Sequence, residues 1–171
     1  RSAQMMNADN ASISQEQFYS LLDSVKESMD GYKNAANLVI FVHEVEELPK
    51  GLYIFIRNKE PLSSLKRLMR NTFEWEAIRE DFYCLQKADF RYQAKQISCN
   101  QDIAADGAFS LGMLCEFSEQ IHTGGPHRYK ELYWECGAIG QQLYLEATSL
   151  NLSATGIGCF LDRSLAPQVI I

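Results

Sequence analysis

The sequence predicts a domain of mixed helix and strand, in which a central β-sheet is flanked by helices. Segments with helical periodicity, such as residues 14–29, are interspersed with short runs rich in β-branched and aromatic residues, such as residues 37–45. The chain has 171 residues, of which 46% are hydrophobic, which suits one domain with a core that needs no cross-links. The predicted class is therefore α/β or α+β, with residues 1–171 as a single domain.

The first part of the chain is expected to form a helix, two strands and a second helix. Ser14 is a good N-cap for the first helix, with Gln17 as its capping-box partner. The β-rich runs NLVIFVHEV (37–45) and GLYIFIR (51–57) are joined by EELPKG, which predicts a hairpin or two neighbouring strands. Residues 61–71 open with a proline, which favours the beginning of a helix.

The second part is expected to return to helix, then strand, then helix, then strand. Residues 74–97 are predicted to form one or two helices, and residues 107–117 form a third apolar, strand-like run. A long helix over 129–150 follows, and the chain then runs into a short predicted strand over 153–160.

The predicted helix over 129–150 is apolar around most of its circumference. Steps of 100° give an apolar stripe of Leu132, Cys136, Ile139, Leu143, Ala147 and Leu150, a polar stripe of Glu131, Glu135, Gln142 and Glu146, and a third face of Tyr133, Trp134, Gly137, Gly140, Gln141 and Tyr144. Such a helix is covered on more than one side. Each interior glycine costs roughly 1 kcal/mol relative to alanine, and close approach of another backbone or a ligand is the usual reason for one. The helix is a candidate for the centre of the domain or of a dimer interface; a buried core helix without a ligand role is the alternative.

The run ATGIGCF places two glycines on one face of the expected strand. Alternation puts Gly156 and Gly158 on the same side, which leaves a flat surface of bare backbone. That surface suits a planar ring lying against the chain, with amide N–H groups at its edge. A bulge or a tight strand crossing is the alternative.

Charge and cysteine content exclude several classes of function. The net charge of −6 makes nucleic acid and anionic membranes poor partners. The cysteines stand at positions 84, 99, 115, 136 and 159, with no C-x-x-C pair. We expect them to be small buried hydrophobes in a reducing compartment, not a disulfide framework or a zinc site. No apolar run approaches the roughly 18 residues that span a bilayer, and no signal peptide is evident, so a cytoplasmic protein is expected.

Histidines and acidic residues offer no metal site and no convincing catalytic pair. His43, His122 and His127 have no carboxylate or cysteine beside them at ligand spacing, and we expect them on the surface. The Gly/Pro-rich loop that contains His122 and His127 could border a substrate pocket, but it lacks the pattern of a phosphate-binding P-loop.

Taken together, YKELYWECGAIGQQLYLEATSLNLSATGIGCFLD resembles the nitroreductase superfamily of FMN-dependent oxidoreductases. That family has a helix of the form E-x-G-x-x-x-Q-x-x-x-L-x-A, matched by Glu135, Gly137, Gln141, Leu145 and Ala147. A second family pattern is matched by Leu150, Leu152, Ile157, Gly158, Phe160 and Asp162, with Asn151 in place of the usual glycine. Three further segments are most similar to the subgroup that includes the azoline-oxidising dehydrogenases of thiazole/oxazole peptide biosynthesis. They are LVIFVHEVEELPKGLYIF, CNQDIAADGAFSLGMLCEF and RSAQ.

The resemblance implies an α+β homodimer with a mixed or antiparallel central sheet and FMN at the subunit interface. By position, Arg1 and Ser2 would contact the flavin phosphate and ribityl chain, with Gln4 nearby. The segment Gly156, Ile157, Gly158 and Cys159 would line the isoalloxazine ring, with backbone N–H groups near N5. Gln101 is a further candidate, as part of a loop near the flavin or as a simple helix cap.

Two places depart from the family pattern. The family has a second basic pair near its C-terminus, and this chain ends at Ile171 before that segment, so we expect parent sequence to be missing or the flavin site to be incomplete. The loop before the first internal strand matches loosely, with Lys33 and Asn34 as its polar candidates.

These features predict an FMN-dependent oxidoreductase of small molecules with no catalytic side chain of its own. A nicotinamide cofactor, NAD(P)H, or a reduced substrate would donate a hydride to flavin N5, and the flavin would pass electrons to an acceptor. The alternative is a non-catalytic relative that keeps the dimeric scaffold and binds a partner or small ligand. A flavin-storage or flavin-modifying role is a third possibility.

Overall fold

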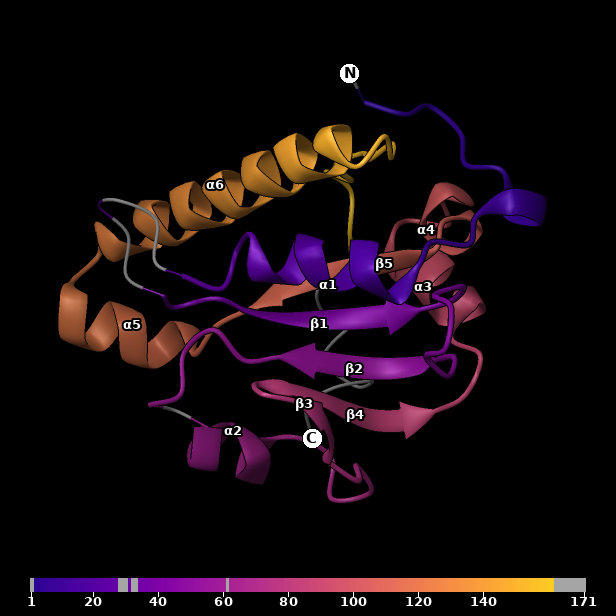
Figure 1. The fold of residues 1–171 in the computed structure, drawn as a ribbon. Helices are drawn as coiled ribbons and strands as arrows, with labels where there is room; N and C mark the ends of the chain where they lie inside the picture. Colours follow the sequence, from indigo (N-terminus) through magenta and orange to yellow (C-terminus); the bar gives the residue numbers. More distant parts are fainter. Residues whose placement is uncertain (1, 28–30, 32–33, 61, 162–171) are drawn as a thin grey trace.

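The computed structural model describes residues 2–27, 31, 34–60 and 62–161 and has the predicted α+β architecture. The strands are β1 (Asn37–Val42), β2 (Gly51–Phe55), β3 (Glu76–Arg79), β4 (Phe82–Lys87) and β5 (Phe109–Leu114). The helices are the 3-10 helix η1 (Ala8–Asn10), α1 (Gln15–Asp23), α2 (Leu62–Leu68), α3 (Arg91–Ile97), α4 (Ile103–Asp106), α5 (Phe117–Gly124) and α6 (Arg128–Ser149). The strands form one antiparallel sheet in the order β3-β4-β2-β1-β5 (Figure 1).

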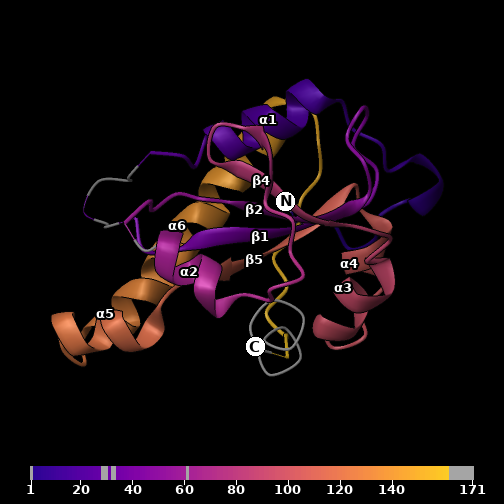
Figure 2. The same ribbon diagram turned by 90° about the horizontal axis from the view of Figure 1, so that it is seen from below.

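The sheet is covered on both faces, with β1 near its centre. Ile40 of β1 stands opposite Tyr53 on one side and Leu111 on the other. Successive residues of β1 point to opposite faces, so Ile40 packs with α1 and α6, whereas Phe41 packs with α2 and α3. Figure 2 shows α2 on the near side of the sheet and α6 crossing behind it. Burial on both faces explains why the sequence of β1 is a nearly continuous run of apolar residues.

Local sequence signals located the helices that frame the candidate site. Ser14 caps α1 as predicted: its Oγ accepts a hydrogen bond from Gln17 N at 3.1 Å, and Gln17 Oε1 accepts one from Ser14 N at 3.0 Å. The helix ends at Asp23, earlier than predicted, and residues 28–29 of the prediction lie outside the described part. The long helix α6 spans Arg128–Ser149, as predicted within a residue. No helix in the described ranges is long and apolar enough to cross a bilayer.

The prediction of helix over residues 74–97 was wrong for most of that segment. The chain forms the hairpin β3–β4 there, and only Arg91–Ile97 is helical. The hairpin turns at Asp81, which has a left-handed φ of 62°. Strand β4 pairs with β2, with Cys84 opposite Tyr53. Pairing with the open edge of β2 therefore decided the structure of a segment whose aromatic spacing also suits a helix.

The predicted strand over residues 153–160 was also wrong. No strand is assigned in residues 152–161, and a hydrogen bond from Ala3 N to Ala154 O, 2.9 Å long, joins this segment to the N-terminal residues. A lone backbone bond of this kind makes no ladder, so the segment follows an irregular path after α6.

Candidate functional site

The two segments that the resemblance assigns to the flavin meet at Tyr144 on α6. The hydroxyl of Ser2 lies 2.9 Å from the hydroxyl of Tyr144. The backbone N–H of Gly156 donates a hydrogen bond to the same Tyr144 oxygen at 2.6 Å. Figure 1 shows the N-terminal segment beginning beside the end of α6. We call Ser2, Tyr144 and Gly156 the Tyr144 cluster.

The hydrogen bonds around Tyr144 make its hydroxyl more acidic. Burial raises the pKa of Tyr144, but the hydrogen bonds with Ser2, Gly156 and Thr155 together bring the pKa below its ordinary value of 10.0. A phenol with a lowered pKa is a stronger hydrogen-bond donor. The Tyr144 cluster is thus a polar, partly exposed junction that fixes both segments relative to α6.

The backbone at Gly156 and Gly158 is exposed and has open space beside it. A Cβ added at Gly158 would have no neighbour within 4 Å, and one at Gly156 would meet the Tyr144 hydroxyl at 3.7 Å. Nothing in the described part of this chain therefore requires glycine at position 158. A tight strand crossing, the alternative reason for these glycines, is therefore not seen among the described residues.

Other residues predicted for the flavin site are placed less favourably. Arg1 lies outside the described residues. Gln4 is exposed and Ile157 is half-buried. The side chain of Gln101 donates from Nε2 to Ser98 O at 2.9 Å, so it stabilises its own turn. The structure thus brings Ser2 and Gly156 together, but no contact of the described residues joins Gln101 to them.

The expectation that all five cysteines are unpaired was wrong. Cys99 and Cys159 form a disulfide with a Cα–Cα distance of 5.8 Å, while Cys84, Cys115 and Cys136 are free. The two bonded residues are 60 positions apart in the sequence, and the fold brings the turn after α3 beside the segment after Gly158. Cys159, predicted to line the flavin, therefore has its sulfur bonded to Cys99.

A buried ion pair at the centre of the molecule was missed in the sequence. Arg57 Nη1 lies 3.0 Å from Glu135 Oε1, and the two side chains are 1% and 2% exposed. The same carboxylate oxygen accepts hydrogen bonds from Ala35 N at 2.9 Å and Ala36 N at 3.1 Å. The helical wheel placed Glu135 on a polar stripe, which was wrong. Glu135 is the glutamate of the E-x-G pattern in this helix, and that position could have indicated a buried, structurally important acid.

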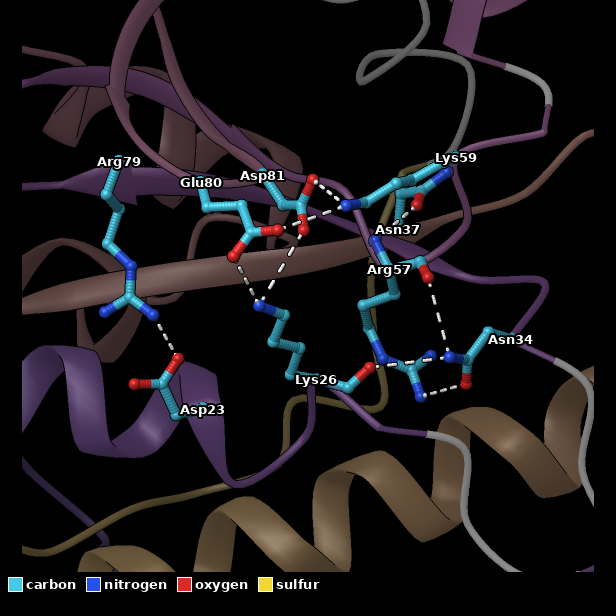
Figure 3. A network of polar contacts seen from close by, with 9 residues as sticks. All are labelled: Asp23, Lys26, Asn34, Asn37, Arg57, Lys59, Arg79, Glu80 and Asp81. Atoms are coloured by element: carbon cyan, nitrogen blue, oxygen red, sulfur yellow. Dashed lines mark hydrogen bonds and ion pairs between the residues drawn. The ribbon is translucent and has the colours of Figure 1, made fainter.

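Arg57 also connects the turn after α1 and the segment before β1 through all three of its side-chain nitrogens. It donates from Nε to Val25 O at 2.5 Å, from Nη1 to Ala36 O at 3.0 Å, and from Nη2 to Asn34 Oδ1 at 3.0 Å. Figure 3 shows Asn34 and Arg57 pointing toward one another. The side chain of Asn34, a candidate for flavin contact, is thus engaged within the chain, and Lys33 lies outside the described residues.

A second polar network holds the β3–β4 turn against the end of α1 (Figure 3). Lys59 lies 3.0 Å from Asp81 and 3.4 Å from Glu80, and Lys26 lies 3.2 Å from Glu80. The bonds to the two lysines lower the pKa of Glu80. Two cations face two anions here, so the network is balanced and its role is structural.

The histidines divide into one buried and two exposed residues. His43 is only 1% exposed, which corrects the prediction of a surface position, and its Nε2 lies 3.1 Å from Ala104 O. Burial is the main cause that lowers the pKa of His43. His122 and His127 are exposed, as predicted. Within the described ranges, no group of three or more His, Cys, Asp or Glu residues is arranged to hold a metal ion.

Several large aromatic and apolar side chains of α5 and α6 are exposed, and we call the surface that carries them the α5–α6 face. Its large exposed side chains are Phe117, Tyr129, Tyr133, Trp134 and Leu145. Gly137 and Gly140 lie on α6, and a Cβ at either would meet no atom of residues 2–27, 31, 34–60 or 62–161 within 4 Å. This region includes much of the third face of the predicted helix, and a single chain leaves it largely uncovered.

Comparisons with known proteins identify the family of this chain by sequence and support its fold by structure. A family model described as "Nitroreductase family" matches residues 8–169. The fold matches the crystal structure of a protein from Anabaena variabilis, provisionally named a nitroreductase, with a TM-score of 0.79 and 21% sequence identity. The match covers 99% of this chain and 33% of that chain, so this chain spans about a third of the length of that protein. No curated protein matches the chain. Neither match distinguishes the azoline-oxidising subgroup from the rest of the family.

Proposed function

This chain belongs to the nitroreductase family, and we propose that it is an FMN-dependent oxidoreductase whose flavin lies beside the Tyr144 cluster. One observation carries the proposal. Ser2 and Gly156 come from the two sequence patterns that the family resemblance assigns to the flavin, and both contact the same Tyr144 oxygen.

We propose that the bare backbone at Gly156 and Gly158 receives the face of the ring. When bound, FMN supplies the ability to accept and donate a hydride at its N5 atom. The residues of this chain bind and orient it: Ser2 would hydrogen-bond the ribityl chain or phosphate, while Arg1 and Gln4 would lie near the same end. Tyr144 holds Ser2 and Gly156 in place and need not touch the flavin itself.

No protein acid or base is required for this chemistry, because the flavin carries the reaction. NAD(P)H or a reduced substrate is the proposed donor, and a small molecule is the acceptor. Reduction of a nitro compound and oxidation of an azoline are the two reaction classes that the sequence resemblance suggests.

We further propose that the α5–α6 face is covered by a second copy of the chain in a homodimer. Exposed aromatic residues such as Trp134, which is 54% exposed, support this, since fully buried aromatic side chains stabilise interfaces strongly. The open space above Gly137 and Gly140 would let the two helices approach closely. In the family, the flavin sites lie at such an interface.

A visible absorbance spectrum of the purified protein, taken before and after FMN is added and free FMN is removed, tests the flavin site. The wild type should retain both visible bands of bound flavin. Gly158→Val should lose them while keeping the fold, because no atom of the described residues lies within 4 Å of the added Cβ. Ser153→Val, an exposed position in the same segment, serves as the matched control.

A non-catalytic scaffold is the second candidate. Three residues that the oxidoreductase proposal would use for flavin contact are instead engaged within the chain. They are Asn34, Gln101 and Cys159. A wild-type protein that stays colourless and retains no FMN would favour the non-catalytic scaffold and contradict the proposed oxidoreductase function.

A further inference from the structure

We propose that the Cys99–Cys159 disulfide is a redox-sensitive tether that fixes residues 157–161 against the turn between α3 and α4, and that reduction releases them. Cys99 follows the end of α3 at Ile97, and Cys159 directly follows Gly158. The backbone N–H of Leu161 donates to Ile97 O at 2.7 Å, so a covalent bond and a hydrogen bond join the same two segments.

Few other contacts hold residues 157–161. The last attachment before them is the hydrogen bond from Gly156 N to Tyr144. Beyond it, the described residues 157–161 form no strand pairing, and Phe160 and Leu161 are 56% and 47% exposed. Because residues 157–161 form no helix or strand, the disulfide and the hydrogen bond from Leu161 to Ile97 are the restraints that we expect to fix the segment.

The disulfide is accessible to a reductant. Cys159 is exposed and Cys99 is half-buried, so a thiolate can approach the Sγ of Cys159 from solvent. Cys99 and the following Asn100 have left-handed φ values of 53° and 62°, which are unfavourable for residues with a Cβ. Breaking the bond would let this turn relax as well as freeing the segment.

The reaction is thiol–disulfide exchange with a cellular dithiol or with two small thiols. One thiolate attacks the Sγ of Cys159, which forms a mixed disulfide and releases Cys99 as a thiolate that takes up a proton. A second thiolate attacks the reductant's sulfur in the mixed disulfide, so Cys159 leaves and takes up a proton. The protein gains two electrons and two protons, and the reductant is oxidised to its disulfide.

The tether also bears on the flavin, and this part rests on the proposed function. Gly158 is the immediate neighbour of Cys159, so the oxidised state holds the ring-facing backbone in one conformation. A preorganised site loses less conformational freedom on binding. We therefore infer that FMN binds more tightly to the oxidised protein, with an affinity ratio on the order of fivefold or more.

The test begins with the oxidised full-length chain, prepared with oxidised glutathione. Thiol titration of the denatured, unreduced protein should find three free thiols, since two of the five cysteines are paired. Five free thiols would overturn the proposal. A digest without reductant should give one peptide pair joined through Cys99 and Cys159.

Hydrogen exchange then measures the release. Amides of residues 157–161 should exchange faster after dithiothreitol treatment and in the Cys99→Ser/Cys159→Ser variant, while the β1 amides stay protected. Cys115→Ser, which removes a free thiol, is the control and should respond to dithiothreitol as the wild type does. Equal exchange in the oxidised and reduced proteins would overturn the tether.

Titration of both states with FMN separates the two proposals. The coupling is supported if reduction weakens FMN binding to the wild type but does not change FMN binding to the Cys99→Ser/Cys159→Ser variant. Equal affinities would overturn the coupling. If neither state binds FMN, the proposed function and the coupling fail, while hydrogen exchange still decides the tether.

Discussion

The hydroxyls of Ser2 and Tyr144 lie 2.9 Å apart although 142 positions separate them in the sequence. Tyr144 also accepts the N–H of Gly156. One side chain on α6 thus connects the beginning of the chain to the glycine segment that follows the helix.

Tyr144→Phe should weaken FMN binding while keeping the fold. The variant loses the contacts to Ser2 and Gly156, each a partly exposed hydrogen bond with a modest net contribution of about 1 kcal/mol or less. We expect roughly a fivefold higher Kd for FMN, measured by fluorescence titration. Tyr92→Phe, which removes an exposed hydroxyl from α3, outside the proposed site and interface, is the matched control. An unchanged Kd for Tyr144→Phe would remove the Tyr144 cluster from the site.

Trp134→Glu should shift the protein from dimer to monomer. Trp134 is 54% exposed in one chain, so the substitution leaves the fold intact but places a charge in the proposed interface. Loss of a central aromatic contact costs about 2 kcal/mol or more of association free energy. Sedimentation velocity measures the change, and Tyr92→Glu, at an exposed position on α3, is the control. A wild type that sediments as a monomer at high concentration would contradict the proposed homodimer.

Glu135→Gln should strongly destabilise the protein. The substitution keeps an acceptor for the Ala35 and Ala36 amides but leaves the Arg57 cation buried without its anion. Breaking a buried ion pair in this way costs about 3–5 kcal/mol of unfolding free energy, which urea denaturation measures.

The more exposed Glu131, one turn earlier on α6, provides the control variant Glu131→Gln. The double variant Arg57→Gln/Glu135→Gln should lose less than the sum of the two single variants, because the pair is coupled. Additive losses would show that the charge interaction contributes little.

His43 should make the stability depend on pH below its ordinary pKa of 6.5. Burial lowers the pKa of His43 in the folded state, so the unfolded chain binds a proton more readily as the pH falls below 6.5. Unfolding free energy is therefore fully retained above that pH and falls as the pH decreases toward the folded-state pKa.

The comparison of wild type with His43→Gln isolates this effect from that of the carboxylates. His43→Gln should show a shallower loss of unfolding free energy between neutral and mildly acidic pH, measured by urea denaturation at each pH. The exposed His122→Gln variant controls for the loss of one histidine. Identical pH profiles for wild type and His43→Gln would contradict this account.

Sequence reasoning succeeded where the structure depends on near neighbours in the chain. The capping box of Ser14 and Gln17 and the periodicity of α6 are local signals, and both predicted their elements correctly. The apolar runs of β1, β2 and β5 were predicted for the same reason. For the site, the sequence patterns identified Ser2 and Gly156 as candidates, and the structure shows that they share a partner in Tyr144.

Tertiary structure decided the features that depend on distant residues. Residues 76–87 became a hairpin because β4 pairs with β2, although their spacing also suits a helix. Glu135 was buried because Arg57 reaches it from a segment 78 positions away, and Cys159 was paired because the fold places Cys99 beside it.

The sequence by itself therefore determined the mixed helix-and-strand class and the long helix α6, since each leaves a local pattern of apolar residues or caps. The family resemblance narrowed the class to α+β and supplied the two segments proposed to meet the flavin. The strand order, the buried Arg57–Glu135 pair, the disulfide and the meeting of Ser2 with Gly156 at Tyr144 were decided only by tertiary structure. Each of these is a contact between residues far apart in the chain, and no periodicity or spacing within one segment specifies which distant residue will be its partner.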